Sequence, residues 1–202
     1  MTSSEDTDRA PDGRPMVGPF DRAGWRAWLI ANHETTSGVY LVSWRRASGR
    51  TSVSYEDAVE EALCVGWVDS SGRNLDEERS IQWFARRRPR SVWARSNKER
   101  VARLTEAGLM LPAGLAVVEE AHRTGMWTML DAVEDLIVPA DLASALEARS
   151  PARGNWDAFP PSARRAMLQW VVEARRPETR AKRIAEIAEK ATRNERAYPP
   201  PG

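Results

Sequence analysis

The amino-acid sequence predicts an α+β fold, with a small, mainly antiparallel sheet and helices in the first half and a helical second half. Residues 38–44 (GVYLVSW) are rich in β-branched and aromatic side chains, which is typical of a strand, and residues 80–85 are strand-like as well. Apolar residues between Ala163 and Ala174 recur instead at helical spacing. We therefore expect the sheet to lie roughly between residues 38 and 86.

The first half also carries two helix signals. Asp21 can cap a first helix, whose tryptophans and leucine share one face and which ends near Asn32. The run from Ser54 to Asp57 resembles a capping box and predicts a second helix. Residues 64–69 (CVGWVD) then become extended, and we expect residues 70–74 to form a turn.

Helix start and stop signals recur along the second half. Ser96 to Glu99 form another capping box, and Gly108 suits the end of that helix. Proline is favoured at the first position of a helix because its missing N–H group has no partner there. On this basis further helices are predicted to open at Pro112, Pro139 and Pro177.

The predicted domain organisation has four parts. Residues 1–17 are polar and aperiodic, so we expect a disordered tail, followed by an α+β core over residues 18–150. A pair of C-terminal helices over residues 151–196 is expected to pack on that core, and residues 197–202 to form a frayed tail.

Composition limits the class of protein. The chain has 202 residues, of which 42% are hydrophobic and 29% charged, which is typical of a globular protein. A single cysteine excludes an internal disulfide, and no apolar run approaches the roughly 20 residues of a membrane span. The first residues lack the apolar core of a secretory signal, so we expect a cytoplasmic protein without membrane insertion.

Metal and cofactor signals are weak. The two histidines lie far apart in sequence, no Cys-x-x-Cys pair is present, and no glycine-rich phosphate loop occurs. We therefore expect neither a metal site nor a cofactor. Cys64 with Asp69 could form a thiol site, but a cysteine between Leu63 and Val65 is more often a small buried hydrophobic residue.

The arginine stretch, residues 79–98 (RSIQWFARRRPRSVWARSNK), is the main candidate site. Its formal charge is +7, whereas the whole chain carries only +1. Arginine forks bind phosphate or carboxylate, and interleaved tryptophans can stack on a planar ligand. The candidate ligand-binding residues are Trp83, Arg87, Arg88, Arg90 and Trp93 within the stretch, together with Asp69, Trp67 and Asn97.

The alternative is a solvated basic edge whose arginines pair with acids such as Asp69, Asp76 or Glu99. Successive side chains of a strand point to opposite faces, so these arginines cannot all line one pocket. The pocket hypothesis therefore requires at least two of Arg87, Arg88 and Arg90 to converge on a cleft.

Four blocks of sequence resemble the YdeI/OmpD-associated proteins, also described as bacteriocin-protection proteins. They are residues 20–33 (FDRAGWRAWLIANH), 55–69 (YEDAVEEALCVGWVD), 87–114 (RRPRSVWARSNKERVARLTEAGLMLPAG) and 170–184 (WVVEARRPETRAKRI). The resemblance implies a role in stress or antimicrobial tolerance and supplies no catalytic residue. The chain departs from the expected pattern at Arg86, Ala94 and Arg175, where the family more often has Pro, Ser and Lys.

Three functions remain open at this point. The leading hypothesis is a cytoplasmic binding protein that contributes to such tolerance by recognising an anionic or aromatic small ligand through the arginine stretch. The second is an enzyme for a small phosphorylated or carboxylated substrate, with Asp69 as base. The third is a nucleic-acid or protein interaction module, although a net charge of +1 disfavours nucleic acid. The sequence leaves the oligomeric state and any catalysed reaction undecided.

Overall fold

The computed structural model describes residues 9–198 and divides them into two compact units, which we describe separately. The first unit holds residues 9–91 and 96–124, and the second holds residues 92–95 and 125–198. This division differs from the expected boundary after residue 150, which falls inside the second unit. None of the helices within residues 9–198 is long and apolar enough to cross a membrane.

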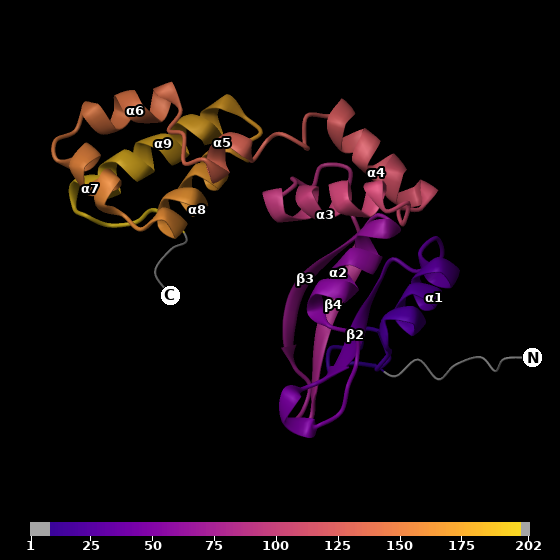
Figure 1. The fold of residues 1–202 in the computed structure, drawn as a ribbon. Helices are drawn as coiled ribbons and strands as arrows, with labels where there is room; N and C mark the ends of the chain where they lie inside the picture. The colour runs from indigo at the N-terminus through magenta and orange to yellow at the C-terminus, as the bar shows by residue number, and fades with distance from the viewer. Residues whose placement is uncertain (1–8, 199–202) are drawn as a thin grey trace, which may run out of the picture. The chain divides into compact units, whose positions relative to one another are not determined.

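The first unit is built on a four-stranded sheet with the order β1-β2-β4-β3 (Figure 1). The strands are β1 (Met16–Val17), β2 (Gly38–Trp44), β3 (Trp67–Asn74) and β4 (Arg79–Arg86). Only the short β1 pairs in parallel, with β2; the other two pairings are antiparallel. The predicted α+β class with a small, mainly antiparallel sheet in the N-terminal half is therefore confirmed.

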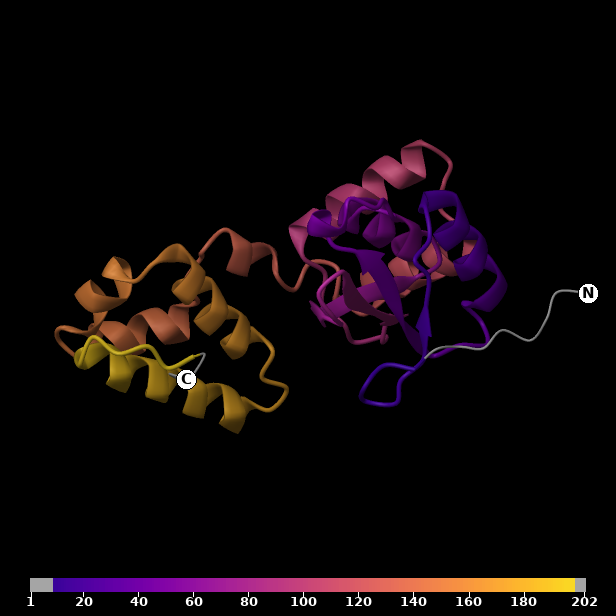
Figure 2. The ribbon, with the colours of Figure 1, turned by 90° about the horizontal axis from the view of Figure 1, so that it is seen from below.

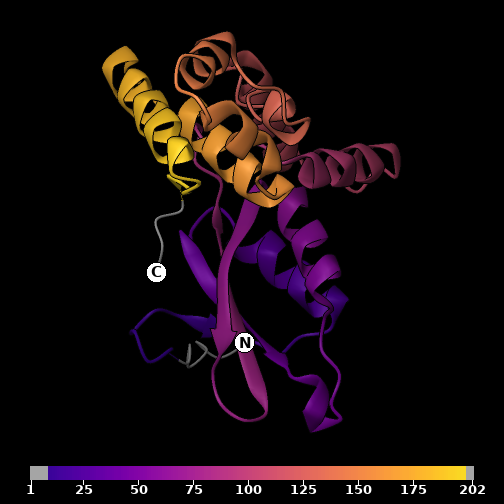
Figure 3. The same ribbon diagram turned by 90° about the vertical axis from the view of Figure 1, so that its left-hand side faces the viewer.

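Two helices cover one face of the sheet. Figure 3 shows α1 (Arg22–Asn32) and α2 (Tyr55–Cys64) on the same side of it. Trp25 is fully buried, packs at 5.3 Å from the ring of Phe84, and donates its indole N–H to the carbonyl of Ala58 at 3.1 Å. A large apolar ring with one satisfied donor thus joins both helices to the sheet.

The expected N-terminal tail is partly wrong, because residues 9–17 are ordered. Met16 pairs with Tyr40 in the sheet, and Ala10 is only 4% exposed. Both pack against the uncovered sheet face beside Trp83. A two-residue strand is too short to show periodicity, so local sequence could not predict β1, which is held by these long-range contacts. Residues 1–8 lie outside the described part of the chain.

The turn expected at residues 70–74 is also wrong. Those residues continue β3, which pairs with β4 through a register shift between Asp69 and Gly72. Ser, Gly and Asn favour turns locally, but a neighbouring strand that accepts their backbone hydrogen bonds overrides that preference. The chain reverses later, at residues 75–78.

The first unit is completed by a short 3₁₀ turn at Arg46–Ser48 and by α3 (Arg95–Glu106) and α4 (Pro112–Arg123). Pro112 opens α4 as predicted. Buried Glu61 in α2 accepts hydrogen bonds from two α1 side chains, Arg22 and Arg26, each at 2.6 Å. These bonds fix the packing of α1 on α2.

The second unit is helical. It contains α5 (Asp131–Glu134), α6 (Ala140–Glu147), α7 (Ala152–Ala158), α8 (Pro161–Val172) and α9 (Pro177–Thr192). Helix α9 contacts α6, α7 and α8 (Figure 1 and Figure 2). Its apolar face closes a core with buried Trp156 and Met167.

The expected frayed tail is wrong for its first two residues. Ala197 is 4% exposed and belongs to the core of the second unit, while Tyr198 stacks on Trp170 at 5.3 Å. Residues 199–202 lie outside the described part of the chain. The aromatic stack anchors the segment that follows α9.

Candidate functional site

The three arginines of the predicted cleft differ in burial. Arg87, just after β4, is only 8% exposed, whereas Arg88 and Arg90 are exposed on a turn that Ser91 closes by donating its N–H to the carbonyl of Arg88. Burial lowers the pKa of Arg87 to about 10, and the negative charge of Asp69 opposes that shift. Arg87 is thus buried while Arg88 and Arg90 are exposed, because the chain leaves β4 at this point and turns.

The two candidate tryptophans of the arginine stretch, Trp83 and Trp93, belong to different units. Trp83 lies on the uncovered face of the sheet, with its ring 4.9 Å from Tyr40 and under the guanidinium of Arg14 at 4.8 Å. Trp93 is 2% exposed in the second unit, where its ring lies 5.0 Å from that of Trp127. Each ring is engaged in packing within its own unit.

The remaining predicted residues make structural contacts in the first unit. Trp67 is 1% exposed and packs edge-on against Trp28 at 6.1 Å. Asn97 accepts a hydrogen bond from Arg100 at 2.9 Å. Asp69 accepts one from the hydroxyl of Tyr55 at 2.7 Å. Tyr55 is largely exposed, but partial desolvation and this bond to the carboxylate raise its pKa to about 12.

Cys64 lies at the end of α2 with 1% of its surface exposed. Burial raises the pKa of its thiol, which keeps it protonated and unreactive. Within residues 9–198, no group of three or more His, Cys, Asp or Glu side chains is placed to hold a metal ion.

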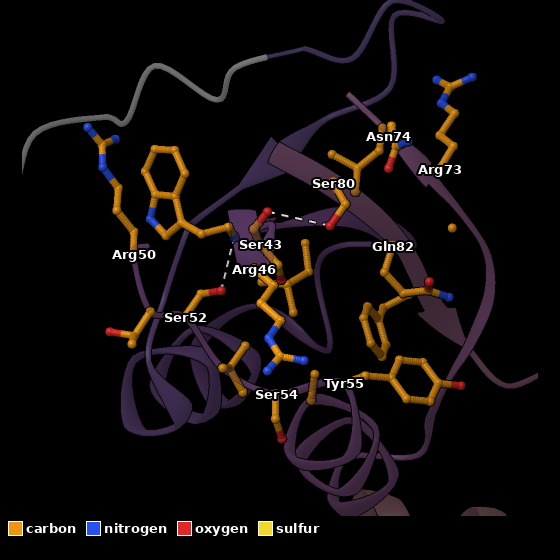
Figure 4. Close-up of a pocket in the computed structure, with 18 residues that line it drawn as sticks. Ser43, Arg46, Arg50, Ser52, Ser54, Tyr55, Arg73, Asn74, Ser80 and Gln82 are labelled. Atoms are coloured by element: carbon orange, nitrogen blue, oxygen red, sulfur yellow. Dashed lines mark hydrogen bonds between the residues drawn. The ribbon is translucent and has the colours of Figure 1, made fainter. Parts of the chain in front are cut away.

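A pocket of about 630 Å³ lies elsewhere in the first unit, on the helix-covered face of the sheet (Figure 4). We call it the Arg46 pocket. It is bounded by the ends of the strands, the loop between β2 and α2, and the start of α2. Its lining consists of Leu41, Ser43, Trp44, Arg46, Arg50, Thr51, Ser52, Val53, Ser54, Tyr55, Ala58, Gly72, Arg73, Asn74, Ser80, Ile81, Gln82 and Phe84.

Strand register creates the sheet wall of the pocket. Ser43 is paired with Ser80, and Leu41 with Gln82, and paired residues on neighbouring strands share a face. Asn74 pairs with Ser80 from the other side. Three strands thus present hydroxyl and amide groups in one row, above buried apolar residues.

The pocket lining contains three arginines that are placed differently. Arg46 points into the hollow, as Figure 4 shows, and its guanidinium has no hydrogen bond or ion pair with any residue in the described range 9–198. Arg50 lies over the ring of Trp44 at 4.4 Å. Arg73 belongs to the opposite sheet face and pairs with Asp12 at 3.1 Å.

No acidic residue lines the Arg46 pocket. Two carboxylates, those of Asp57 and Asp69, are bound to lining residues at its edge. Ser54 donates to Asp57 at 2.7 Å, and Arg22 forms an ion pair with the same carboxylate. Asp69 accepts from Tyr55, so both negative charges are already compensated by a cation or a hydrogen-bond donor.

None of the eight predicted site residues lines this pocket. The loop over residues 46–54 supplies six of its lining positions, yet local pattern predicts from this region only the helix cap at Ser54. Its signal was available: arginines and hydroxyl side chains follow a strand without any acidic residue between Arg45 and Tyr55. Such a loop satisfies few charges internally.

Comparisons with known proteins match the two parts of the chain separately. Residues 19–117 match a family described as a domain of unknown function (DUF8412), and this range contains the Arg46 pocket. Three of the four resembling blocks, residues 20–33, 55–69 and 87–114, lie inside it. No curated protein and no solved structure matches the chain significantly. Residues 135–194 match the family described as bacteriocin-protection, YdeI or OmpD-associated, which supports the sequence resemblance, and the fourth resembling block, residues 170–184, lies inside this range.

Proposed function

We propose that the chain is a binding protein for a small anionic ligand, which it holds in the Arg46 pocket. The observation that carries the proposal is the guanidinium of Arg46, which points into a pocket lined by no acidic residue and has no ion pair with any residue in the range 9–198. Of the predicted anionic or aromatic ligand, the proposal keeps the anionic class, and it moves the site from the arginine stretch to the loop after β2. A cavity of about 630 Å³ lies within the range of small-molecule sites.

The polar groups at the rim support the same ligand class. The guanidinium of Arg46 can donate two parallel hydrogen bonds to an oxyanion. Hydroxyl and amide groups of Ser43 and Asn74 lie on the sheet wall and have no side-chain hydrogen bond with residues 9–198. Together they offer donors to an anion without any neighbouring carboxylate in the lining to repel it.

A contribution to stress or antimicrobial tolerance, and a cytoplasmic location, are part of this proposal. The family description attaches to residues 135–194, whereas the pocket lies within residues 19–117. A cationic antimicrobial peptide would be repelled by a pocket lined with arginine. We therefore propose that tolerance is indirect and depends on recognition of the small anion.

The test is a thermal-shift screen of carboxylates, phosphorylated metabolites, neutral aromatic compounds and a short oligonucleotide. A ligand that binds only the folded state raises the melting temperature. We expect anions to stabilise the wild type and an Arg88→Gln/Arg90→Gln control, but not Arg46→Gln. Arg46 is exposed and has no described partner, so the unliganded variant should melt at the wild-type temperature.

Two results would contradict the proposal. An equal anion response in Arg46→Gln and the wild type would place binding outside this pocket. A response lost only in the Arg88→Gln/Arg90→Gln control would return the site to the arginine stretch. Stabilisation by the oligonucleotide that declines steeply with salt would favour the nucleic-acid alternative.

A further inference from the structure

We infer that the ligand of the Arg46 pocket is a monoanionic carboxylate with an apolar body. Its carboxylate is bound by Arg46, and its body lies against the apolar floor and the ring of Tyr55. This inference rests on the proposed function and narrows its ligand class. It depends on three features of the pocket: the number of positive charges available to a ligand, the lack of free donors at the α2 N-terminus, and the apolar residues at the base.

The first feature is that one of the three arginines is available to a ligand. Arg50 rests on Trp44, with its guanidinium 4.4 Å from the ring centre. Arg73 is turned to the other sheet face, where it pairs with Asp12 and lies over Tyr40 at 5.5 Å. Figure 4 shows both side chains directed away from the hollow that Arg46 enters. One guanidinium neutralises one negative charge, which matches a carboxylate better than a doubly charged phosphate.

The second feature is that the N-terminus of α2 adds little to anion binding. Its N-cap residue Ser54 accepts the backbone N–H of Asp57 at 3.1 Å, so that donor is already used. Glu56 and Asp57 occupy the first turn and offset the positive end of the helix dipole. A polyphosphate normally relies on several backbone N–H donors or cations, and this N-terminus offers few of them.

The third feature is an apolar floor that an inorganic ion could not cover. Leu41, Val53, Ala58 and Phe84 line the base, and each is at most 6% exposed. The ring of Tyr55 is 58% exposed at the side. A ligand body packed here removes its own apolar surface and part of the exposed Tyr55 from water, while the floor residues, which are already buried, supply packing contacts. The single available charge at one end and the apolar base together fit an amphiphilic acid.

The test uses isothermal titration with 3-phenylpropionate as probe and four comparison compounds. These are its neutral amide, acetate, inorganic phosphate and adenosine triphosphate. We expect 3-phenylpropionate to bind at least about ten-fold tighter than each of them, because only it supplies both one charge and an apolar body. Arg46→Gln should abolish the preference for the acid over its amide.

Matched variants at Tyr55 separate the two halves of the ligand. Tyr55→Phe keeps the ring and should leave the affinity for 3-phenylpropionate within about two-fold. Tyr55→Ala removes the ring and should lower the affinity for 3-phenylpropionate. The affinity for acetate should not change, because acetate has no apolar body. Circular dichroism of each variant checks that α2 remains folded.

The outcomes distinguish this inference from the proposed function. If phosphate or the triphosphate binds tightest and depends on Arg46, the pocket binds anions but the carboxylate inference is overturned. If the acid and its amide bind equally, the charge of Arg46 plays no part and both proposals fail. If none of the five compounds binds, both are overturned for this pocket.

Discussion

Replacing Gly114 with alanine gives the sharpest test of the packing in the first unit. Gly114 is a buried residue of α4 at the point where this helix meets the end of α2. A Cβ at this position would lie 2.4 Å from the carbonyl oxygen of Cys64 and 2.8 Å from that of Leu63. Both atoms belong to the backbone, so neither can rotate away and the two helices must separate.

The cost of Gly114→Ala can be worked out from opposing contributions. Forcing an extra methyl group into a packed contact costs about 1–3 kcal/mol. Separation also weakens the hydrogen bond from the Leu111 N–H to the Cys64 carbonyl, now 3.0 Å long, which contributes about 1 kcal/mol. Alanine recovers about 1 kcal/mol of helix propensity. The net expectation is a loss of about 1–3 kcal/mol in the free energy of unfolding.

Urea unfolding followed by far-ultraviolet circular dichroism measures this change. Gly154→Ala is the matched control, since a Cβ at Gly154 in α7 would meet no atom within 4 Å. There the same substitution should stabilise the protein by about 0.5–1 kcal/mol. An unchanged or higher stability for Gly114→Ala would refute the close approach of α4 to α2.

Three further predictions concern ionisable groups in α2. Glu61→Gln removes the charge that two arginines of α1 share and should lower the free energy of unfolding in urea by about 1–2 kcal/mol. The control is Glu120→Gln in an exposed ion pair, which should change this free energy by less than about 0.5 kcal/mol. A hydrogen bond from Arg100 lowers the pKa of Glu56 from its ordinary 4.5. The ionised Glu56 therefore contributes fully to folding stability above pH 4.5, and this contribution is lost as pH falls through the lowered pKa. Acid unfolding should therefore show the stability deficit of Glu56→Gln shrinking below pH 4.5; a constant deficit would contradict the ion pair. Cys64 should resist a thiol reagent in the native protein and react only after unfolding, and native-state labelling at the rate of a free thiol would show that the site is open.

Local patterns predicted the elements whose stabilising contacts are close in sequence. The strand expected at residues 38–44 coincides with β2, and Ser54 caps α2 by accepting the N–H of Asp57, as its capping-box pattern indicates. β1 and the second half of β3 could not be predicted in this way. Their backbone groups are satisfied by strands distant in sequence, and no local preference records that pairing.

The Arg46 pocket escaped prediction for a related reason. Its sheet wall requires Ser43, Ser80 and Asn74 to lie side by side, which depends on the register of three strands. A change of one residue in that register would turn each side chain to the opposite face. The sequence shows the hydroxyl and amide groups but contains no local signal for the register that brings them together.

The arginine stretch shows why a high local density of charge is a poor indicator of an anion site. Arg79 pairs with Asp76 at 2.7 Å, Arg86 donates to the carbonyl of Thr36 at 3.1 Å, and Arg95 pairs with Asp135 at 2.7 Å. Arg87 is buried near Asp69. Side chains engaged in this way fasten the ends of strands and helices, and a ligand would have to replace those contacts before it could bind. Arg46 instead extends from a short loop that lacks acidic residues, so its donors remain available. In the proposed site, anion binding therefore depends on a guanidinium that is both unpartnered within residues 9–198 and placed at a pocket, and that combination is set by the tertiary structure.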